Sequence, residues 1–273
     1  MRTFASCILT SSWGCMLSAK RTCVPTAGWE SLLSAETREA VEGLDPQLFG
    51  FDRRNCPCAI PAQGKMAMKD HLFMATAVRP PLWHNKMQNV PDMKTLQAAM
   101  RARGAEGLNL TGFYERDRKG GACALYVQPQ DDRLQISEYT STEAEFGCLP
   151  WESKTAAVRD RSDEIFIFVC AHKARDARCG YCGPILVDLF EQKNAAMGQK
   201  VNIFPCSHFG GHVYAANLLV FTRHIGRAYG LFRPEHVEPL LEGLVSGNAE
   251  ALTMLEDKVR GQLVLKTKVK ASL

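Results

Sequence analysis

The sequence predicts an α/β protein built from two consecutive units, the second more regular than the first. Short apolar runs of strand length alternate along the chain with segments of helical period, and turns rich in glycine and proline separate them. Of the 273 residues, 46% are hydrophobic and 23% are charged, as in ordinary globular proteins. A chain of this length forms one large domain or two average ones. A polar, irregular stretch at 131–154 places the predicted boundary near Ser153.

Residues 1–29 contain no acidic residue, are rich in serine and threonine, and carry three basic residues. This composition is typical of an organellar presequence, with a disordered tail as the alternative. We therefore expect a mitochondrial protein, and a cytoplasmic one as the alternative. The chain has eleven cysteines, an odd number, which argues against a fully paired secreted disulfide framework. Metal or thiol chemistry is the expected use of these cysteines.

The first unit, residues 30–153, is expected to be a small α/β domain. Its predicted helices lie within 31–48 and 94–103, because apolar residues recur there at helical spacing. Its predicted strands are 71–78, 107–114 and 122–128, and the turn at 118–121 joins the last two.

The second unit, residues 154–273, carries stronger signals. Predicted strands at 164–170, 201–205 and 214–222 alternate with helices at 184–197 and 233–244, each helix with a proline near its start. An order of strand, helix, two strands and helix, with cysteines at the end of the first strand, is the thioredoxin-like arrangement. The first unit has a fainter version of this order, which leaves open that it is a degenerate thioredoxin-like unit.

Two short motifs in the second unit hold cysteines and histidines at a higher density than any other stretch of the chain. One holds Cys170, Cys179 and Cys182, and the other holds Cys206, His208 and His212. Thiolates and imidazoles are the ligands that iron, zinc and copper prefer.

Two interpretations follow from spacing alone. Cys179 and Cys182 form a C-x-x-C motif, which indicates a thiol–disulfide oxidoreductase, although that leaves both histidines unexplained. Alternatively, Cys179, Cys182, His208 and His212 form a structural zinc site in an interaction module. The gap between the two pairs is longer than that of a zinc finger.

A third interpretation comes from a resemblance. The run from Cys170 to Cys179 with Arg175 and Arg178 inside it, and the run from Ser207 to Asn217, resemble signature motifs of the sucrase/ferredoxin-like proteins. The resemblance is strongest over residues 160–245. It implies a thioredoxin-like ferredoxin domain whose [2Fe–2S] cluster is held by two cysteines and two histidines. The matching positions are Cys170, Cys179, His208 and His212.

The ligand set suggested by this resemblance has consequences for the potential. Two thiolates and two neutral imidazoles leave an oxidised site near neutrality, so its reduction potential is higher than with four thiolates. The non-ligating nitrogen of an imidazole can exchange a proton as the charge changes, which predicts a pH-dependent potential. Protonation also competes with iron for the imidazoles, which predicts a cluster that is labile to acid.

Several neighbours of these positions are secondary candidates. Charge compensation near the cluster is one expectation for Arg175 and Arg178, and solvated loop positions are the other. We expect Gly210 and Gly211 to permit a tight loop, and Asn217 either to hold that loop or to face the surface. We expect Cys182 and Cys206 to be buried thiols, with a redox pair or substitute ligands as the alternatives. Cys56 and Cys58 are either a redox-active thiol pair or a loop pair without chemistry.

Other classes of function have little support. The net charge is only +4, and basic residues do not gather with aromatic ones as in a nucleic-acid groove. No apolar run approaches the ~20 residues that cross a bilayer. No nucleophile with an oriented base is recognisable. We therefore expect electron transfer or redox sensing with an unknown protein partner, not catalysis on a substrate of its own.

Overall fold

The computed structural model describes residues 28–56, 62–105, 107–116, 118 and 120–265. The presequence expected at residues 1–29 falls almost wholly outside the described residues. Cys58 also lies outside them. Within the described ranges, no helix has the length and apolarity needed to cross a bilayer.

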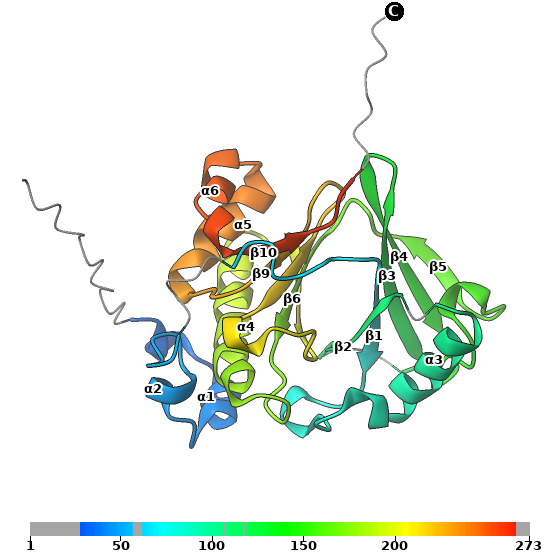
Figure 1. Ribbon diagram of the computed structural model, residues 1–273, viewed down its shortest axis with the longest axis horizontal. Helices are drawn as coiled ribbons and strands as arrows, with labels where there is room; N and C mark the ends of the chain where they lie inside the picture. Colours follow the sequence, from blue (N-terminus) through cyan, green and yellow to red (C-terminus); the bar gives the residue numbers. More distant parts are fainter. Residues whose placement is uncertain (1–27, 57–61, 106, 117, 119, 266–273) are drawn as a thin grey trace, which may run out of the picture.

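The chain forms six α-helices, ten strands and seven short 3₁₀ turns in its described part (Figure 1). The helices are α1 (Ala35–Val41), α2 (Pro46–Phe49), α3 (Pro91–Ala102), α4 (Ala177–Ala196), α5 (Val237–Ser246) and α6 (Ala249–Thr253). The first five strands are β1 (His71–Thr76), β2 (Asn109–Tyr114), β3 (Ala122–Gln130), β4 (Arg133–Ser141) and β5 (Ala157–Asp160). The others are β6 (Ile165–Cys170), β7 (Val201–Cys206), β8 (Leu218–Phe221), β9 (Gly226–Tyr229) and β10 (Val259–Gln262). The 3₁₀ turns are η1 (Trp29–Leu32), η2 (Pro80–Leu82), η3 (Met87–Asn89), η4 (Pro150–Glu152), η5 (His212–Tyr214), η6 (Pro234–His236) and η7 (Glu256–Lys258).

All ten strands join one sheet in the order β10-β9-β8-β6-β7-β2-β1-β3-β4-β5. In the second half, β6 pairs in parallel with β7 and antiparallel with β8, and β8 pairs antiparallel with β9. The first half repeats this pattern with β1, β2, β3 and β4. This is the strand order of a thioredoxin-like unit, present twice. The α/β class and the thioredoxin-like second unit are therefore confirmed, and the first unit shares the topology.

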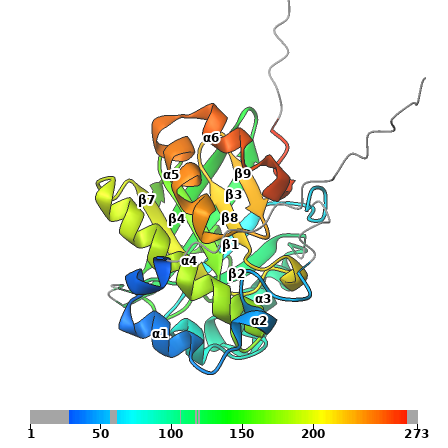
Figure 2. The same ribbon diagram turned by 90° about the vertical axis from the view of Figure 1, so that its left-hand side faces the viewer.

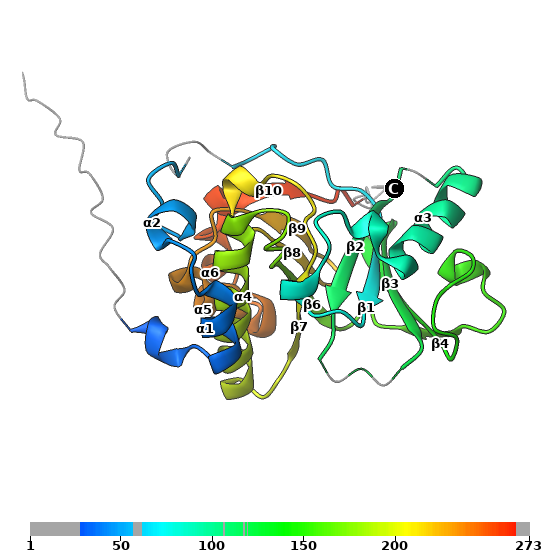
Figure 3. The same ribbon diagram turned by 90° about the horizontal axis from the view of Figure 1, so that it is seen from below.

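The two halves meet where β2 and β7 pair antiparallel at Phe113 and Cys206. The half-sheets also face each other through a shared core, in which the rings of Phe73 and Phe168 stack with centroids 3.8 Å apart. Helices α4 and α5 cover the outer face of the second half, and α3 covers that of the first (Figures 2 and 3). The carboxyl ends of β2 and β7 thus lie together at the centre of the molecule.

The structure differs from the sequence prediction in several places. The stretch 131–154, expected to be irregular, contains strand β4, whose Leu134 and Ile136 are buried while polar residues alternate with them. Helices α1 and α2, expected in the first unit, pack on α4 of the second. Strand β5 extends the first half-sheet beyond Ser153. The division into independently folding units at Ser153 stays a prediction.

Helix α4 also begins earlier than expected, at Ala177 and not near Pro184. Asp176 caps it, because its side chain accepts a hydrogen bond from the Arg178 amide. Pro184 lies inside the helix. The early start places Cys179 in the first helical turn, where backbone N–H groups have no partners within the helix.

Candidate metal centre

Cys170, Cys179 and His208 come together at the carboxyl ends of the central strands. The Nδ1 atom of His208 lies 3.8 Å from each of the two sulfur atoms. All three donor atoms lie within 4.8 Å of one another. Both thiols are buried, whereas the imidazole is partly exposed. This grouping joins residues from both sequence motifs.

The local fold explains this convergence. Parallel strands β6 and β7 end at the same edge, with Cys170 opposite Cys206, so His208 follows two residues beyond that edge. Helix α4 starts at the same edge and approaches β6 closely at Gly183. A Cβ on Gly183 would lie 2.3 Å from the carbonyl oxygen of Cys170. Glycine is therefore needed there to let the helix bring Cys179 toward Cys170.

His212 lies next to this group, and the three converging donors do not include it. Its ring stacks beside that of His208, with centroids 5.6 Å apart. Its Nδ1 is 3.9 Å from a carboxylate oxygen of Asp176, and 46% of its side chain is exposed. The loop between the histidines turns at Gly210 and Gly211, which both have positive φ (104° and 71°). The fourth expected ligand is thus adjacent to the other three, on the solvent side.

The surroundings of Cys179 favour its protonated thiol. A hydrogen bond with Cys170, together with burial, raises the pKa of the Cys179 thiol. A soft metal ion must displace such protons when thiolates bind it. The chemistry of the donors, two sulfurs beside two imidazoles, fits a cluster of the bis-cysteine, bis-histidine kind.

His172 supports the ligand loop, a role that its isolated position in the sequence does not reveal. Its Nδ1 accepts a hydrogen bond from the backbone amide of His208 (3.2 Å), and its Nε2 lies 3.0 Å from the carbonyl oxygen of His84. Both contacts are satisfied only by a neutral imidazole with its proton on Nε2. Burial lowers the pKa of His172 to about 4, which keeps that tautomer neutral at physiological pH.

Asn217 and Arg260 hold the same loop from its other side. Asn217 donates from Nδ2 to the carbonyl oxygen of Gly211 (3.0 Å) and accepts from Arg260 Nη1 (2.7 Å). Arg260 is buried, and its guanidinium lies over the ring of Tyr214. No role for Arg260 was predicted from the sequence.

The remaining secondary candidates divide into two groups. Arg178 forms a two-pronged ion pair with Asp176 and so leaves the Asp176 carboxylate neutralised. Arg175 is exposed and donates to Asn85 (3.4 Å) across a groove beside His208.

Cys182 and Cys206 are free, fully buried thiols. Cys182 donates to the carbonyl oxygen of Phe49 (3.4 Å) and packs in the α4–α5 core, away from the three converging donors. The zinc ligand set that included Cys182 is therefore not brought together. Cys56 is disulfide-bonded, so it is not a free thiol.

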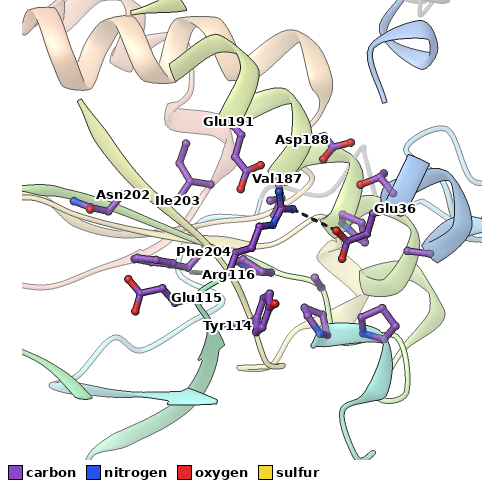
Figure 4. Close-up of a pocket in the computed structure, with 17 residues that line it drawn as sticks. Glu36, Tyr114, Glu115, Arg116, Val187, Asp188, Glu191, Asn202, Ile203 and Phe204 are labelled. Carbon is purple, nitrogen blue, oxygen red and sulfur yellow. Dashed lines mark hydrogen bonds and ion pairs between the residues drawn. The ribbon is translucent and has the colours of Figure 1, made fainter. Parts of the chain in front are cut away.

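A separate cavity of about 390 Å³ lies between α1, α4 and the ends of β2 and β7 (Figure 4). Arg116 reaches across it toward Glu36, 3.5 Å away. Burial raises the pKa of Glu191, although Arg116 opposes this effect. None of the described residues lining the cavity is a cysteine or histidine, so it supplies no soft metal donor.

The chain is similar in sequence to several known proteins. The sucrase/ferredoxin-like family model matches residues 61–261. Altered inheritance of mitochondria protein 32 from Debaryomyces hansenii is 28% identical over 155 residues, 55% of each chain. Actin patches distal protein 1 from Saccharomyces cerevisiae is 32% identical over 109 residues, 34% of each chain. The matches thus span about half or less of these relatives. A thioredoxin-like [2Fe-2S] ferredoxin from Aquifex aeolicus aligns at 19% identity and a TM-score of 0.30, covering 37% of this chain and 93% of that one.

Proposed function

This chain belongs to the sucrase/ferredoxin-like family, and on that basis we propose that it binds a [2Fe–2S] cluster and carries electrons or senses redox state. The proposed ligands are Cys170, Cys179, His208 and His212. The observation that supports this most directly is the convergence of two buried sulfurs and the His208 nitrogen within 4.8 Å. Both sequence motifs contribute to this group, as a shared metal centre requires.

Different parts of the fold hold the thiols and the imidazoles of such a centre. Cys170 and Cys179 lie on a strand end and a helix start, so their sulfurs are held rigidly in a buried site. The two imidazoles lie nearer to solvent, on a loop held by His172 and Asn217. The buried Arg260 guanidinium supplies a positive charge close to the thiols.

A bound cluster of this type supplies one-electron chemistry, and imidazole ligands raise its potential. His208 and His212 give such a site its most exposed edge. We propose that electrons enter and leave there, and that the protein relays them to a protein partner. The donor group has no neighbouring nucleophile with an oriented base among the described residues, so a substrate of its own is not part of the proposal.

Metal analysis of protein purified without oxygen tests the proposal. We expect a brown protein with about two irons per chain. His208→Cys and His212→Cys should each keep a coloured protein while changing its visible and EPR spectra, because sulfur replaces nitrogen at iron. Cys182→Ser is the matched control and should change neither.

The same metal analysis distinguishes the cluster from a single zinc ion, which is the specific alternative. Three donors within 4.8 Å also suit one tetrahedral ion with a fourth ligand. A colourless protein containing one zinc and no iron, also after iron-supplemented expression, would reject the cluster.

We also propose a mitochondrial location. The acid-free composition of residues 1–29 supports it, and several matching relatives are named for mitochondrial inheritance. A C-terminal fluorescent fusion should mark mitochondria, and the same fusion lacking residues 1–29 should remain in the cytosol. Identical cytosolic patterns for both would contradict this location.

A further inference from the structure

A groove of about 530 Å³ opens directly beside His208, between helix α3 and the segment that carries the ligands. Its base includes the buried side chains of Met87 and Met93. His208 and His172 line one wall. The groove is therefore a surface depression in contact with a proposed ligand.

The charged side chains of this groove are all cationic apart from its histidines. Lys86 comes from the segment before α3, Arg101 from α3 itself, and Arg175 from the loop between the two thiols. All three are exposed, and none forms an ion pair with another described residue. Arg101 and Arg175 donate only to neutral amide oxygens, those of Gln97 and Asn85. Nothing among the described lining residues offsets their charge.

Arg178 shows the contrast, because it lies three residues from Arg175 and its charge is balanced by Asp176. The groove thus retains three unpaired cations at its rim and methionine side chains at its base. Such an arrangement suits a protein surface that presents carboxylates around an apolar contact.

We propose that this groove is the docking site for an acidic surface of the redox partner. Carboxylates of the partner would pair with Lys86, Arg101 and Arg175, and this would bring its redox group close to His208. The inference rests on the proposed function, since it names the partner of that same site. Attraction between opposite charges would also accelerate the encounter at low salt.

Two oxidants of opposite charge test the electrostatic part. Protein reduced by one electron per cluster is mixed in stopped flow with ferricyanide or with tris(phenanthroline)cobalt(III). In each case one electron leaves the protein and reduces the metal complex from its trivalent to its divalent state. We expect the ferricyanide rate to fall as salt increases, and the cobalt rate to rise or stay constant. The triple variant K86E/R101E/R175E should lower the ferricyanide-to-cobalt rate ratio at least about tenfold.

A matched triple variant controls for net charge. Lys69, Arg133 and Lys200 are exposed and lie near the starts of β1, β4 and β7, at the far ends of the two half-sheets from the proposed ligands. K69E/R133E/K200E changes the net charge by the same amount and should alter the rate ratio much less. An equal decrease of the ferricyanide-to-cobalt rate ratio in both triple variants would overturn the proposed docking site.

A binding measurement provides a readout that does not need the cluster. A fluorescent octaglutamate peptide should bind to the protein with or without metal, as seen by fluorescence anisotropy. The groove variant should weaken this binding at least about tenfold, and the control variant should not. Tighter binding of an eight-nucleotide thymidine oligomer than of octaglutamate at the same salt would also overturn the proposal. A colourless protein would reject the proposed cluster. The anisotropy measurement would still show whether the groove binds an acidic peptide.

Discussion

Arg260 and Asn217, although 43 residues apart in the chain, share a buried hydrogen bond of 2.7 Å between Nη1 and Oδ1. Arg260 follows the first residue of β10, at the edge of the sheet, and Asn217 precedes β8. A second hydrogen bond, from Arg260 Nη1 to the carbonyl oxygen of Gly210 (3.3 Å), reaches the loop between the two histidines. The edge strand thus holds the proposed ligand loop in place.

Replacing Arg260 by methionine should therefore weaken both the fold and the metal centre. The change leaves the Asn217 and Gly210 oxygens without their donor, and we expect a loss of about 2 to 4 kcal/mol in the free energy of unfolding. Urea denaturation measures this loss. Iron retention after anaerobic gel filtration reports on the loop itself.

Arg223→Met is the control, because Arg223 pairs with an exposed Asp163. Such a pair contributes less than about 1 kcal/mol. Similar destabilisation by both substitutions would show that Arg260 has no special role.

The sequence predicts the grouping of the site only where its motifs resemble those of a known family, and it misses the contacts that hold the ligand loop. The convergence of Cys170 and Cys179 was expected only from the resemblance to the sucrase/ferredoxin-like proteins, because the sequence pattern placed the start of the helix near Pro184, after both cysteines. The partners of the ligand loop, His172 and Arg260, were not identified, because nothing in their local spacing indicates which loop they contact. Long-range contacts of this kind depend on the completed sheet.

The same distinction explains the secondary structure. Strands β1 and β6 are buried on both faces and appear as continuous apolar runs, which a sequence reveals readily. Strand β4 has exposed polar residues between its buried ones, so its stretch looked irregular. The start of α4 depends on Asp176 as a cap, a weaker signal than the proline that follows within the helix.

Gly183→Ala should separate α4 from β6 and disturb the metal centre. Helix propensity alone would favour alanine by up to about 1 kcal/mol. However, the added Cβ would lie 2.3 Å from the Cys170 oxygen and 2.6 Å from the Ala171 Cα, both backbone atoms that cannot rotate away. We expect the clash to outweigh the gain in helix propensity. The free energy of unfolding should fall by a net of about 1 to 3 kcal/mol, and the protein should bind less iron.

Gly147→Ala is the control for this substitution, since a Cβ there meets nothing within 4 Å. Its free energy of unfolding in urea should stay close to that of the wild type. A stabilised Gly183→Ala protein with full iron content would show that the close approach is not required.

His71 should make folding sensitive to acid. It is fully buried, stacks on Phe73 and lies 2.7 Å from the Thr111 hydroxyl oxygen, while its Nδ1 has no hydrogen-bond partner among the described residues. Burial lowers the pKa of His71 to about 3. In the unfolded chain a histidine titrates at about 6.5. Between these two values the unfolded state binds a proton that the folded state does not.

The contribution of His71 to the free energy of unfolding should therefore be fully present above about pH 6.5 and fall as the pH drops toward 3. The fall due to His71 should be at most about 1.4 kcal/mol per pH unit. Urea denaturation of the metal-free protein at pH 7, 6 and 5 measures the slope. His71→Gln should reduce the slope by about one proton, although it also lowers stability at pH 7. His224→Gln, which changes an exposed histidine, is the control for the loss of a histidine side chain. An unchanged slope in His71→Gln would contradict this account.

The thiols of the metal-free protein should differ sharply in reactivity, which separates the cluster proposal from the thiol–disulfide alternative. An oxidoreductase that uses Cys179 and Cys182 needs an accessible thiol of low pKa. Here both are buried, and burial raises the pKa of the Cys182 thiol; burial likewise raises that of Cys123 to about 12. Cys148, in contrast, is partly exposed.

Brief treatment of the native protein with iodoacetamide at about pH 7.5, followed by peptide mass spectrometry, should modify Cys148 well before these buried thiols. Cys148→Ser should remove that early product. Rapid modification of Cys179, with protection by prior oxidation to a Cys179–Cys182 disulfide, would instead favour the oxidoreductase.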